Sequence, residues 1–540
     1  MKRPRSLLAP LALALLVVAA AVVALIGAKA LPASAGGPRT VPKPALRAPT
    51  FAGHDHFSLD GGDSYTAASR RITASVQATT NLKPTRYTEP RVYRSRGGVL
   101  RVTLHPHPSS AIVNGQRTFG METFTGTYPG PTLRVRPGDT IRMRFINGLP
   151  GTFTNLHFHG FRVSPAGLAD NVLRTIVPAV TSKLTAPGKA VNIVVHIPKT
   201  HEHGLYWYHP HFHGNVDPQV YSGLAGMIEV GNVLSNNHYL RNIKKHVMAL
   251  TSIELSGNKL VPVSKASDSK EVNLVNGHYQ PTLTIHPGEL QLWRLANISN
   301  ENFYYLGLGA AGRFHVIAQD GNPVAKVWSP KHILMPPGSR FEFLVRGPAH
   351  GTYHLRSLFF NQGHNRFRQF NFLTLRSQGP AVSKPLPVPK VGSPGQARMV
   401  DHVLDTKVAR RRNLTFSIKP PFPNAFYVNN KLFNIHRVDE KVKLRTTEEW
   451  LLRNTSKEDH PFHIHTNDFL VEKINGKKVP IHGFQDVVTV PRQRGHKPSS
   501  VLIRMRFLKF QGKAVFHCHI LFHEDHAMMG IIQFTRAPKR

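Results

Sequence analysis

The chain is poor in cysteine, in acidic residues and in methionine. Its 540 residues include one cysteine, Cys518, which excludes an intramolecular disulfide and a cysteine-rich zinc finger. Only 30 residues are acidic against 69 basic ones, and a charged share of 18% is too low for a disordered chain. Only 10 methionines are present. The 32 histidines outnumber all acidic residues together, and this excess indicates metal chemistry.

The length and the apolar content indicate several packed domains. A chain of 540 residues with 41% hydrophobic residues has room for roughly two to four domains with packed cores. The net charge of +39 has two interpretations: attraction of anionic donors or an anionic surface, or a general property of exported proteins from the same source. No nucleic-acid-binding motif accompanies the charge, so we expect no specific nucleic-acid partner.

The N-terminus has the pattern of an export signal. Residues 2–5 carry three positive charges, residues 7–27 are uncharged, and Ala-Ser-Ala at 33–35 offers a cleavage site. The uncharged run of 21 residues is also long enough to span a bilayer, so a cleaved signal and a retained anchor both stay open. No adjacent arginine pair marks a twin-arginine signal. We expect residues 1–35 to direct an extracytoplasmic location, with membrane attachment only if they are retained.

One sequence pattern returns three times along the chain. Residues 131–147 contain Pro-Thr-Leu, Pro-Gly-Asp and Phe-Ile-Asn, and residues 281–297 repeat them as Pro-Thr-Leu, Pro-Gly-Glu and Leu-Ala-Asn. A weaker third copy ends at Asn454. The alternating apolar residues predict half-buried strands joined by Pro-Gly turns. Short strands, many turns and no long helical period predict an all-β protein of three sandwiches or barrels.

The repeats suggest a domain division. We expect a loosely structured lead-in at 36–80, a first domain at 81–235 and a second domain at 236–378. A proline-rich linker at 379–395 then leads to a third domain at 396–540.

Four histidine clusters stand out, two in the first repeat and two in the third. They are His157-Phe158-His159, His209-Pro210-His211, His460-Pro461-Phe462-His463-Ile464-His465, and His517-Cys518-His519 followed by His523 and Met528. Because residues i and i+2 of a strand face the same side, each His-x-His pair presents two imidazoles to one surface. Two exposed histidines explain a single pair, but not four pairs in register with the repeats. Eight imidazoles exceed the needs of one ion, so we expect several metal ions between the first and third domains.

Cys518 faces away from the histidines that flank it. Together with His460, His523 and Met528 it offers a thiolate, two imidazoles and a distant thioether. This is the ligand set of a blue-copper electron-transfer site. The alternative for Met528 is ordinary core packing, and we favour the axial position beside the copper.

These motifs resemble those of the multicopper oxidases, the family of laccases and copper-efflux oxidases. The likeness covers about residues 90–540, and the run from His517 to Met529 is especially similar to bacterial spore-coat laccases. The resemblance implies three consecutive cupredoxin-like Greek-key β-sandwich domains. It also implies four copper ions: one type 1, one type 2 and two type 3.

The resemblance further implies which residues bind each copper. His460, Cys518 and His523 would bind the type 1 copper, with Met528 as its axial neighbour. His157 and His463 would bind the type 2 copper. The type 3 pair would take the six remaining histidines, His159, His209, His211, His465, His517 and His519.

Two acidic residues are candidate catalytic groups by the same resemblance. Glu524 matches an acidic residue that relatives use to deliver protons to oxygen, and a surface carboxylate is its alternative. Where many relatives have Asp-Gly after the first motif, this chain has Asp170-Asn171. Asp170 is therefore a candidate acid near the type 2 and type 3 coppers, with turn capping as its alternative.

The implied function is laccase-like. Four one-electron oxidations of phenolic or similar aromatic donors, anionic ones included, would be coupled to reduction of dioxygen to water. The alternative is a cuprous-ion oxidase for copper tolerance, with Cu(I) as the donor. Such relatives often carry a methionine-rich insert, and here only Met528 and Met529 are adjacent. Copper nitrite reductases lack the His-Cys-His arrangement, and the complete ligand set argues against a non-enzymatic envelope protein.

Overall fold

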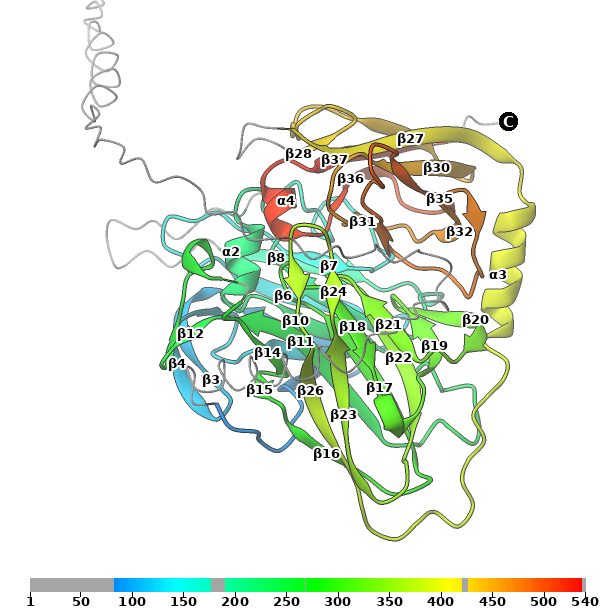
Figure 1. The fold of residues 1–540 in the computed structure, drawn as a ribbon. Coiled ribbons are helices and arrows are strands. Elements are labelled where there is room, and N and C mark those ends of the chain that lie inside the picture. Colours follow the sequence, from blue (N-terminus) through cyan, green and yellow to red (C-terminus); the bar gives the residue numbers. More distant parts are fainter. Residues whose placement is uncertain (1–81, 175, 177–189, 268, 420–425, 537–540) are drawn as a thin grey trace, which may run out of the picture. The chain divides into compact units, whose positions relative to one another are not determined.

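A computed structural model describes residues 82–174, 176, 190–267, 269–419 and 426–536. All described residues belong to one compact unit. The expected export signal at 1–35 and the whole of the expected lead-in at 36–80 lie outside the described residues. Strands dominate the described ranges and confirm the all-β class (Figure 1). No helix within these ranges is long and apolar enough to cross a membrane.

Within the described part of the first third, two sheets face each other across an apolar core. The first consists, in spatial order, of β1 (Val92–Arg94), β5 (Gly130–Val135), β10 (Gly226–Val230), β9 (Gly204–His209) and β7 (His157–His159). The second consists of β2 (Val99–Leu104), β6 (Thr140–Ile146) and β8 (Ala190–His196). Leu133 of β5 and Phe145 of β6 are fully buried between them, as alternating apolar residues predict.

The middle third, as far as it is described, has the same two-layer plan. One sheet consists of β15 (His278–Tyr279), β14 (Val272–Val275), β11 (Lys245–Ile253), β17 (Leu290–Asn297), β22 (Arg340–Arg346), β19 (His315–Gln319) and β20 (Asn322–Trp328). The other consists of β16 (Thr282–Ile285), β26 (Phe370–Ser377), β23 (Gly351–Leu358), β18 (Tyr304–Gly307) and β21 (His332–Met335). A small ribbon pairs β24 (Phe360–Asn361) with β25 (Arg366–Phe367).

The last third carries two further sheets among its described residues (Figure 1). One consists of β28 (Phe426–Val428), β27 (Val408–Ile418), β30 (Thr447–Asn454), β35 (Ser499–Arg506), β32 (Leu470–Ile474) and β33 (Lys477–Lys478). The other consists of β29 (Glu440–Lys443), β37 (Met529–Thr535), β36 (Gly512–Cys518), β31 (His460–Ile464) and β34 (Val487–Val490). Trp450 and Phe462 lie in the core between these sheets.

A few elements link these thirds. One sheet joins β12 (Leu255–Ser256) and β13 (Lys259–Leu260) to β4 (Gln116–Thr123) and β3 (His107–Val113), so it crosses the expected boundary at 235/236. Helix α3 (Pro394–Asp405) begins inside the expected linker, where Ser393 accepts a hydrogen bond from the backbone N–H of Gln396 as its N-cap. The expected domain limits themselves stay a prediction. Short 3-10 turns occur at Val263–Lys265 and Gly309–Ala311.

The sequence repeat corresponds to a repeated hydrogen-bond pattern. The asparagine that ends each copy, Asn147, Asn297 or Asn454, is fully buried. Its side-chain oxygen accepts the backbone N–H two residues later. Its amide nitrogen donates to a carbonyl 29, 38 or 36 residues away, which ties the strand end to a later segment. The buried amide is thus satisfied in the same way in all three copies.

The Pro-Gly turn of the repeat depends on a left-handed residue. Gly138 and Gly288 have φ values of +91° and +79°, where glycine is favoured. The corresponding residue of the third copy is Arg445, which adopts φ 66° without being glycine. The third copy therefore keeps the turn although its sequence signature is weaker.

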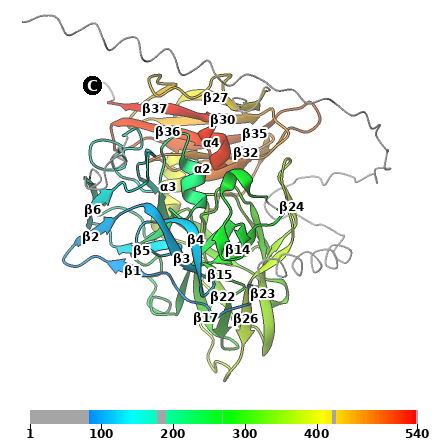
Figure 2. The ribbon, with the colours of Figure 1, turned by 90° about the vertical axis from the view of Figure 1, so that its left-hand side faces the viewer.

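Two short helices connect the first and last thirds. Helix α2 (Val216–Tyr221) and helix α4 (Leu521–Asp525) lie side by side in both views (Figures 1 and 2). The carboxylate of Asp525 accepts the backbone N–H groups of Gly214, Val216 and Asp217 at 2.7–3.1 Å. Apolar residues of the first, middle and last thirds, Trp207, Ala296 and Leu521 among them, form one buried cluster beside these helices.

Candidate metal centres

The register of β31 against β36 determines which side each histidine faces. His463 pairs with His517, and Phe462 pairs with Cys518. Because side chains alternate along a strand, His463 and His517 share one face, and Cys518 lies on the other with His460. The sequence-based expectation for Cys518 therefore agrees with the strand pairing.

The histidines of the first third come from β7 and from the end of β9. His157 pairs with His209 in the antiparallel ladder. The rings of this domain then stack on those of the last third: His157 on His465 with centroids 3.8 Å apart, and His159 on His463 at 3.9 Å. Eight imidazoles thus meet in one buried cluster, each at most 2% exposed: His157, His159, His209, His211, His463, His465, His517 and His519.

The ring nitrogens of this cluster gather into overlapping triads. Each of the triads His157–His159–His209, His157–His463–His465 and His211–His465–His517 has its candidate ligand atoms within 4.8 Å of one another. The Nε2 atoms of His211 and His465 lie 3.2 and 3.3 Å from Nε2 of His517. Nitrogens about 2.0 Å from one tetrahedral ion would be about 3.3 Å apart. The spacing suits a metal ion between these rings.

Several ring nitrogens of the cluster are buried without a hydrogen-bond partner among the described residues. They are Nε2 of His157, His159, His209 and His463, and Nδ1 of His465 and His519. Buried polar atoms of this kind call for a ligand. Burial and then the neighbouring charges, mostly imidazoles, lower the pKa of His157, His463 and His465 well below the usual value. Neutral imidazoles are the form that binds a metal, so the residues fit copper.

In several of these imidazoles, one ring nitrogen is bound to a fixed protein group. This contact orients the other ring nitrogen, which is left to bind a metal. Nδ1 of His463 donates to the main-chain oxygen of Asp486 at 2.8 Å, and Nδ1 of His209 donates to that of Pro210 at 2.8 Å. Nδ1 of His157 lies 3.0 Å from the carboxyl of Asp170. Such partners fix the ring orientation of metal ligands.

The two predicted acids both contact histidines of the cluster. Asp170 is 1% exposed and also accepts the backbone N–H of Phe158, and burial raises its pKa to about 8. Glu524 is fully buried, with its carboxylate oxygens 3.2 Å from Nδ1 of His211 and 3.0 Å from Nδ1 of His517. Burial opposes its ionisation, but the two imidazoles lower its pKa to about 2. Neither residue lies on the surface.

A second, separate group of ligands lies on the opposite face of β36. Sγ of Cys518 is 3.5 Å from Nδ1 of His460 and 3.6 Å from Nδ1 of His523. The three residues form one potential metal-binding group and are at most 6% exposed. Burial raises the pKa of the Cys518 thiol well above its usual range. A bound cation would have to displace this proton to reach the thiolate.

Met528 and two polar residues surround this second group. Met528 is fully buried, and its main-chain oxygen accepts the N–H of Cys518 at 3.1 Å. Nε2 of His460 lies 2.7 Å from Oγ of Ser456, and Nε2 of His523 lies 3.4 Å from Oε2 of Glu458. Both histidines therefore turn Nδ1 toward the sulfur.

The outer edge of His523 is lined by aromatic rings. Phe426 stacks on the imidazole at 4.4 Å with an interplanar angle of 27°. Nearby, Phe522 is 39% exposed and lies 4.0 Å from the ring of His526. This is the part of the second group that a small aromatic molecule could approach.

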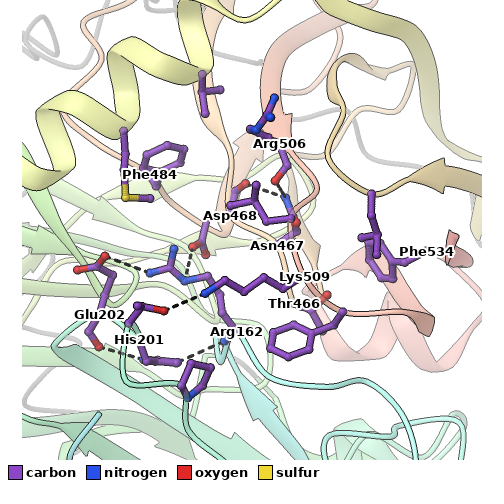
Figure 3. Close-up of a pocket in the computed structure, with 17 residues that line it drawn as sticks. Arg162, His201, Glu202, Thr466, Asn467, Asp468, Phe484, Arg506, Lys509 and Phe534 are labelled. Carbon is purple, nitrogen blue, oxygen red and sulfur yellow. Dashed lines mark hydrogen bonds and ion pairs between the residues drawn. The ribbon is translucent and has the colours of Figure 1, made fainter. Parts of the chain in front are cut away.

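A cavity of about 310 Å³ lies beside the histidine cluster, between segments that follow His159 and His465 (Figure 3). Arg162 lies between the carboxylates of Glu202 and Asp468, at 3.6 and 3.4 Å. The wall also contains apolar side chains, including Met399 of α3 and Phe484, and further basic residues, Arg506 and Lys509. The cavity is thus polar where it meets the segments next to the cluster.

The comparisons with known proteins agree with this geometry. Two sequence profiles described as multicopper oxidase match residues 108–233 and 404–538, which contain all four histidine clusters. Multicopper oxidase mco of Staphylococcus haemolyticus is 28% identical over 427 residues, covering 76% of this chain and 83% of the relative. The chain belongs to the multicopper oxidase family.

This multicopper oxidase is also similar to a laccase and to a multicopper oxidase of known structure. The laccase of Bacillus subtilis is 23% identical over 468 residues, covering 76% of the chain and 90% of that laccase. A solved structure of a multicopper oxidase from Campylobacter jejuni, described as a metallo-oxidase, matches with a TM-score of 0.71 at 22% identity. It covers 85% of this chain and 97% of that one, and confirms the cupredoxin fold. This multicopper oxidase is a copper-dependent oxidoreductase that uses oxygen.

The structure brings together every residue that the sequence analysis singled out and adds three more. Asp486 lies beside His159 and Glu458 beside His523, while Arg340 binds Asp486; the sequence analysis did not find these three residues. No local motif marks Asp486 or Glu458. The signal that could have found Arg340 is the pattern Arg340-Phe341-Glu342, two opposite charges inside an apolar run that forms a buried strand.

Proposed function

We propose that this multicopper oxidase is laccase-like. It takes single electrons from phenolic or similar aromatic donors at one copper and reduces dioxygen to water at three others. The observation that supports the proposal most strongly is the arrangement around Cys518. The group His460–Cys518–His523 and the eight-imidazole cluster occupy opposite faces of one strand end.

Each ligand group has a proposed copper. His460, Cys518 and His523, with Met528, would hold a type 1 copper. His157 and His463 would hold the type 2 copper, and the other six histidines of the cluster the type 3 pair. Bound copper would supply one-electron redox changes, so that electrons arriving singly can reach dioxygen together.

The chain provides a short covalent path between the two ligand groups. Cys518 is bonded through its main chain to His517 on one side and to His519 on the other. Both histidines point into the eight-imidazole cluster. An electron accepted near Sγ of Cys518 can therefore reach the eight-imidazole cluster through the covalent bonds that join Cys518 to the adjacent His517 or His519.

Donor molecules would meet the chain at the edge of His523. The ring is 6% exposed, and Phe426 stacks on it and offers an aromatic surface. A phenol that loses an electron also has to lose its proton. The carboxylate of Glu458, 3.4 Å from Nε2 of His523, offers an acceptor at that place.

Reduction of dioxygen also needs protons at the eight-imidazole cluster. Conversion of one dioxygen to two waters takes four electrons and four protons. Glu524 lies between His211 and His517, and Asp170 lies beside His157. By position, these carboxyl groups are the ones through which protons can reach the eight-imidazole cluster.

The methionines argue for organic donors. Cu(I) is a soft ion that prefers thioether and thiolate ligands. Of the methionines in the described residues, only Met399 of α3 is more than 3% exposed, and it lies with Phe484 in a different cluster from Cys518. The described surface therefore offers no group of thioethers to collect Cu(I). The net charge of +39 favours anionic aromatic donors.

The deciding experiment compares two donors with copper-loaded enzyme. Oxygen uptake is measured with a methoxyphenol and with Cu(I) held by a weak chelator. We expect a higher kcat/KM for the phenol without added copper. A much higher value for Cu(I), with phenol turnover only after copper addition, would establish the cuprous-ion oxidase instead.

We also propose that the protein works outside the cytoplasm, secreted or anchored on the outer face of the membrane. The support is the export pattern of residues 1–35. N-terminal sequencing of protein recovered from medium and membrane fractions tests it. A first residue at position 36 indicates cleavage, an intact N-terminus in the membrane indicates an anchor, and intact protein confined to the cytosol would contradict export.

A further inference from the structure

The middle domain contributes no histidine to the proposed copper sites, yet one of its turns contacts the eight-imidazole cluster. The turn between β21 and β22 includes Gly338, and Arg340 is the first residue of β22. Arg340 is fully buried, although it carries a guanidinium group. A buried charge requires close partners, and those partners lead directly to the copper ligands.

The guanidinium of Arg340 binds the carboxylate of Asp486 at two points. Nη1 donates to Oδ1 at 2.6 Å, and Nη2 donates to Oδ2 at 2.7 Å. Nε donates to the main-chain oxygen of Leu205 at 3.3 Å, and Nη1 also donates to that of Gly338 at 3.1 Å. Arg340 therefore joins all three domains at one side chain, in the bidentate geometry that only arginine provides.

Asp486 in turn contacts two histidines of the cluster. Its main-chain oxygen accepts a hydrogen bond from Nδ1 of His463 at 2.8 Å. Its carboxylate Oδ1 lies 3.4 Å from Nε2 of His159. His463 and His159 also stack on each other at 3.9 Å, so Asp486 lies against both rings of a stacked pair and is hydrogen-bonded to His463.

Glycines on both sides of this contact allow the close approach. A Cβ at Gly338, whose φ is +88°, would lie 2.9 Å from the imidazole of His519 and 3.1 Å from that of His159. A Cβ at Gly160 would collide with the guanidinium of Arg340. The turn of the middle domain is therefore part of the wall around the imidazoles.

We propose that Arg340 is a positioning residue for the type 2 and type 3 copper ligands. It fixes Asp486 in two-point contact, and Asp486 orients His463 and His159. The inference rests on the copper assignment made under the proposed function. The dioxygen-reducing site is then built from three domains, although only two supply metal ligands.

The test compares variants of Arg340 with a variant of a second buried arginine, Arg294. Arg340→Met removes the charge and both contacts, and Arg340→Lys keeps the charge but cannot bind a carboxylate at two parallel points. The control is Arg294→Met. Arg294 is 2% exposed, lies on the paired strand β17 and contacts Glu342 at 2.7 Å. Glu342 binds the backbone of Leu205, so the control disturbs the same domain contact without involving Asp486.

The readouts are copper atoms per chain, the type 2 electron paramagnetic resonance signal and the blue absorption band. We expect Arg340→Met to keep the blue band and to bind the type 2 copper at least about tenfold more weakly, as loss of a partner behind a metal ligand does. Arg340→Lys should fall between Arg340→Met and wild type. Arg294→Met should lose stability but keep the type 2 signal.

Two results would overturn the inference: a wild-type copper content and type 2 signal in folded Arg340→Met, or an equal loss of type 2 copper in Arg294→Met. If Arg340→Met does not fold, Arg340→Lys tests the inference in its place. A wild-type type 2 signal in Arg340→Lys would show that the two-point contact is not needed, and would overturn the inference. A wild-type enzyme that binds only the blue copper would instead refute the proposed function.

Discussion

His463 and His517 are direct cross-strand partners, and the adjacent pair, Phe462 and Cys518, faces the opposite side of the same two strands. A step of one residue therefore separates the proposed electron-accepting site from the proposed dioxygen site. A register shift by one residue would move Cys518 to the face of the imidazoles. The antiparallel pairing of β31 and β36 is thus the feature on which both sites depend.

Replacement of the thiolate should remove the colour and little else. Cys518→Ser eliminates the soft ligand and with it the intense Cu–thiolate absorption in the visible region. The eight imidazoles on the other face stay in place, so copper at that site should be retained. Visible absorption and metal analysis check both points. A Cys518→Ser protein that stays blue would show that the type 1 assignment is wrong.

Removal of a type 2 ligand should separate the two half-reactions. His463→Ala takes away one of only two proposed protein ligands of the type 2 copper, together with the hydrogen bond to Asp486. Anaerobic addition of a donor should still bleach the blue band, whereas oxygen uptake should fall by at least about a hundredfold. Met121→Leu, at a buried position in another core cluster, serves as a control for general destabilisation. Normal oxygen uptake by folded His463→Ala would contradict the assignment.

Exchange of the proposed axial residue should change the potential but not the fold. Met528→Leu keeps the volume of a fully buried side chain, so the loss of stability should stay below about 1.5 kcal/mol. Loss of the thioether should raise the midpoint potential of the blue copper, because the sulfur stabilises the oxidised ion. Redox titration of the blue band measures the shift. An unchanged potential would assign Met528 to core packing alone.

Glu122 should make stability depend on pH at a site unrelated to copper. Burial raises the pKa of its carboxyl from 4.5 to about 7, and its Oε2 is buried without a partner among the described residues. The folded state then binds this proton more tightly than the unfolded state. The contribution of Glu122 to the free energy of unfolding is therefore fully present below about pH 4.5 and is lost as the pH rises through about 7.

Glu122→Gln removes this dependence. The variant should match wild type in free energy of unfolding near pH 4.5 and exceed it at pH 8 by on the order of 1 kcal/mol, allowing for the partial exposure of the group. Urea unfolding at both pH values gives the comparison. A variant that is less stable than wild type at pH 8 would show that the carboxylate is stabilised in the folded state.

Much of the fold and most ligands could be predicted from the sequence because they depend on short-range patterns. The strand period of two places His157 with His159 and sets Cys518 apart from His517. The Pro-Gly turn marked the first two sandwiches, whereas the third copy was recognised by the residues that end at Asn454, and only the structure shows that Arg445 takes the place of glycine there. The start of α3 also has a local signal, Ser393 before Pro394, although the helix is too short to give a long helical period.

The residues behind the ligands could not be predicted in this way. Arg340 meets Asp486 across 146 positions of sequence, and the charged pattern around Arg340 does not indicate which carboxylate it meets. Glu458 lies two residues before His460, yet its contact is with His523 on α4. Such contacts arise from tertiary packing, between domains for Arg340 and within the last domain for Glu458, and not from the spacing of residues along one strand.

The stoichiometry of oxygen consumption tests the central claim most directly. Copper-loaded protein is supplied with a one-electron phenolic donor, and the donor oxidised, the dioxygen consumed and the hydrogen peroxide formed are measured together. We expect four donor molecules oxidised for each dioxygen and no hydrogen peroxide, because four single electrons that pass through Cys518 would reduce one dioxygen fully to two waters. Two donor molecules per dioxygen with accumulation of hydrogen peroxide would contradict it.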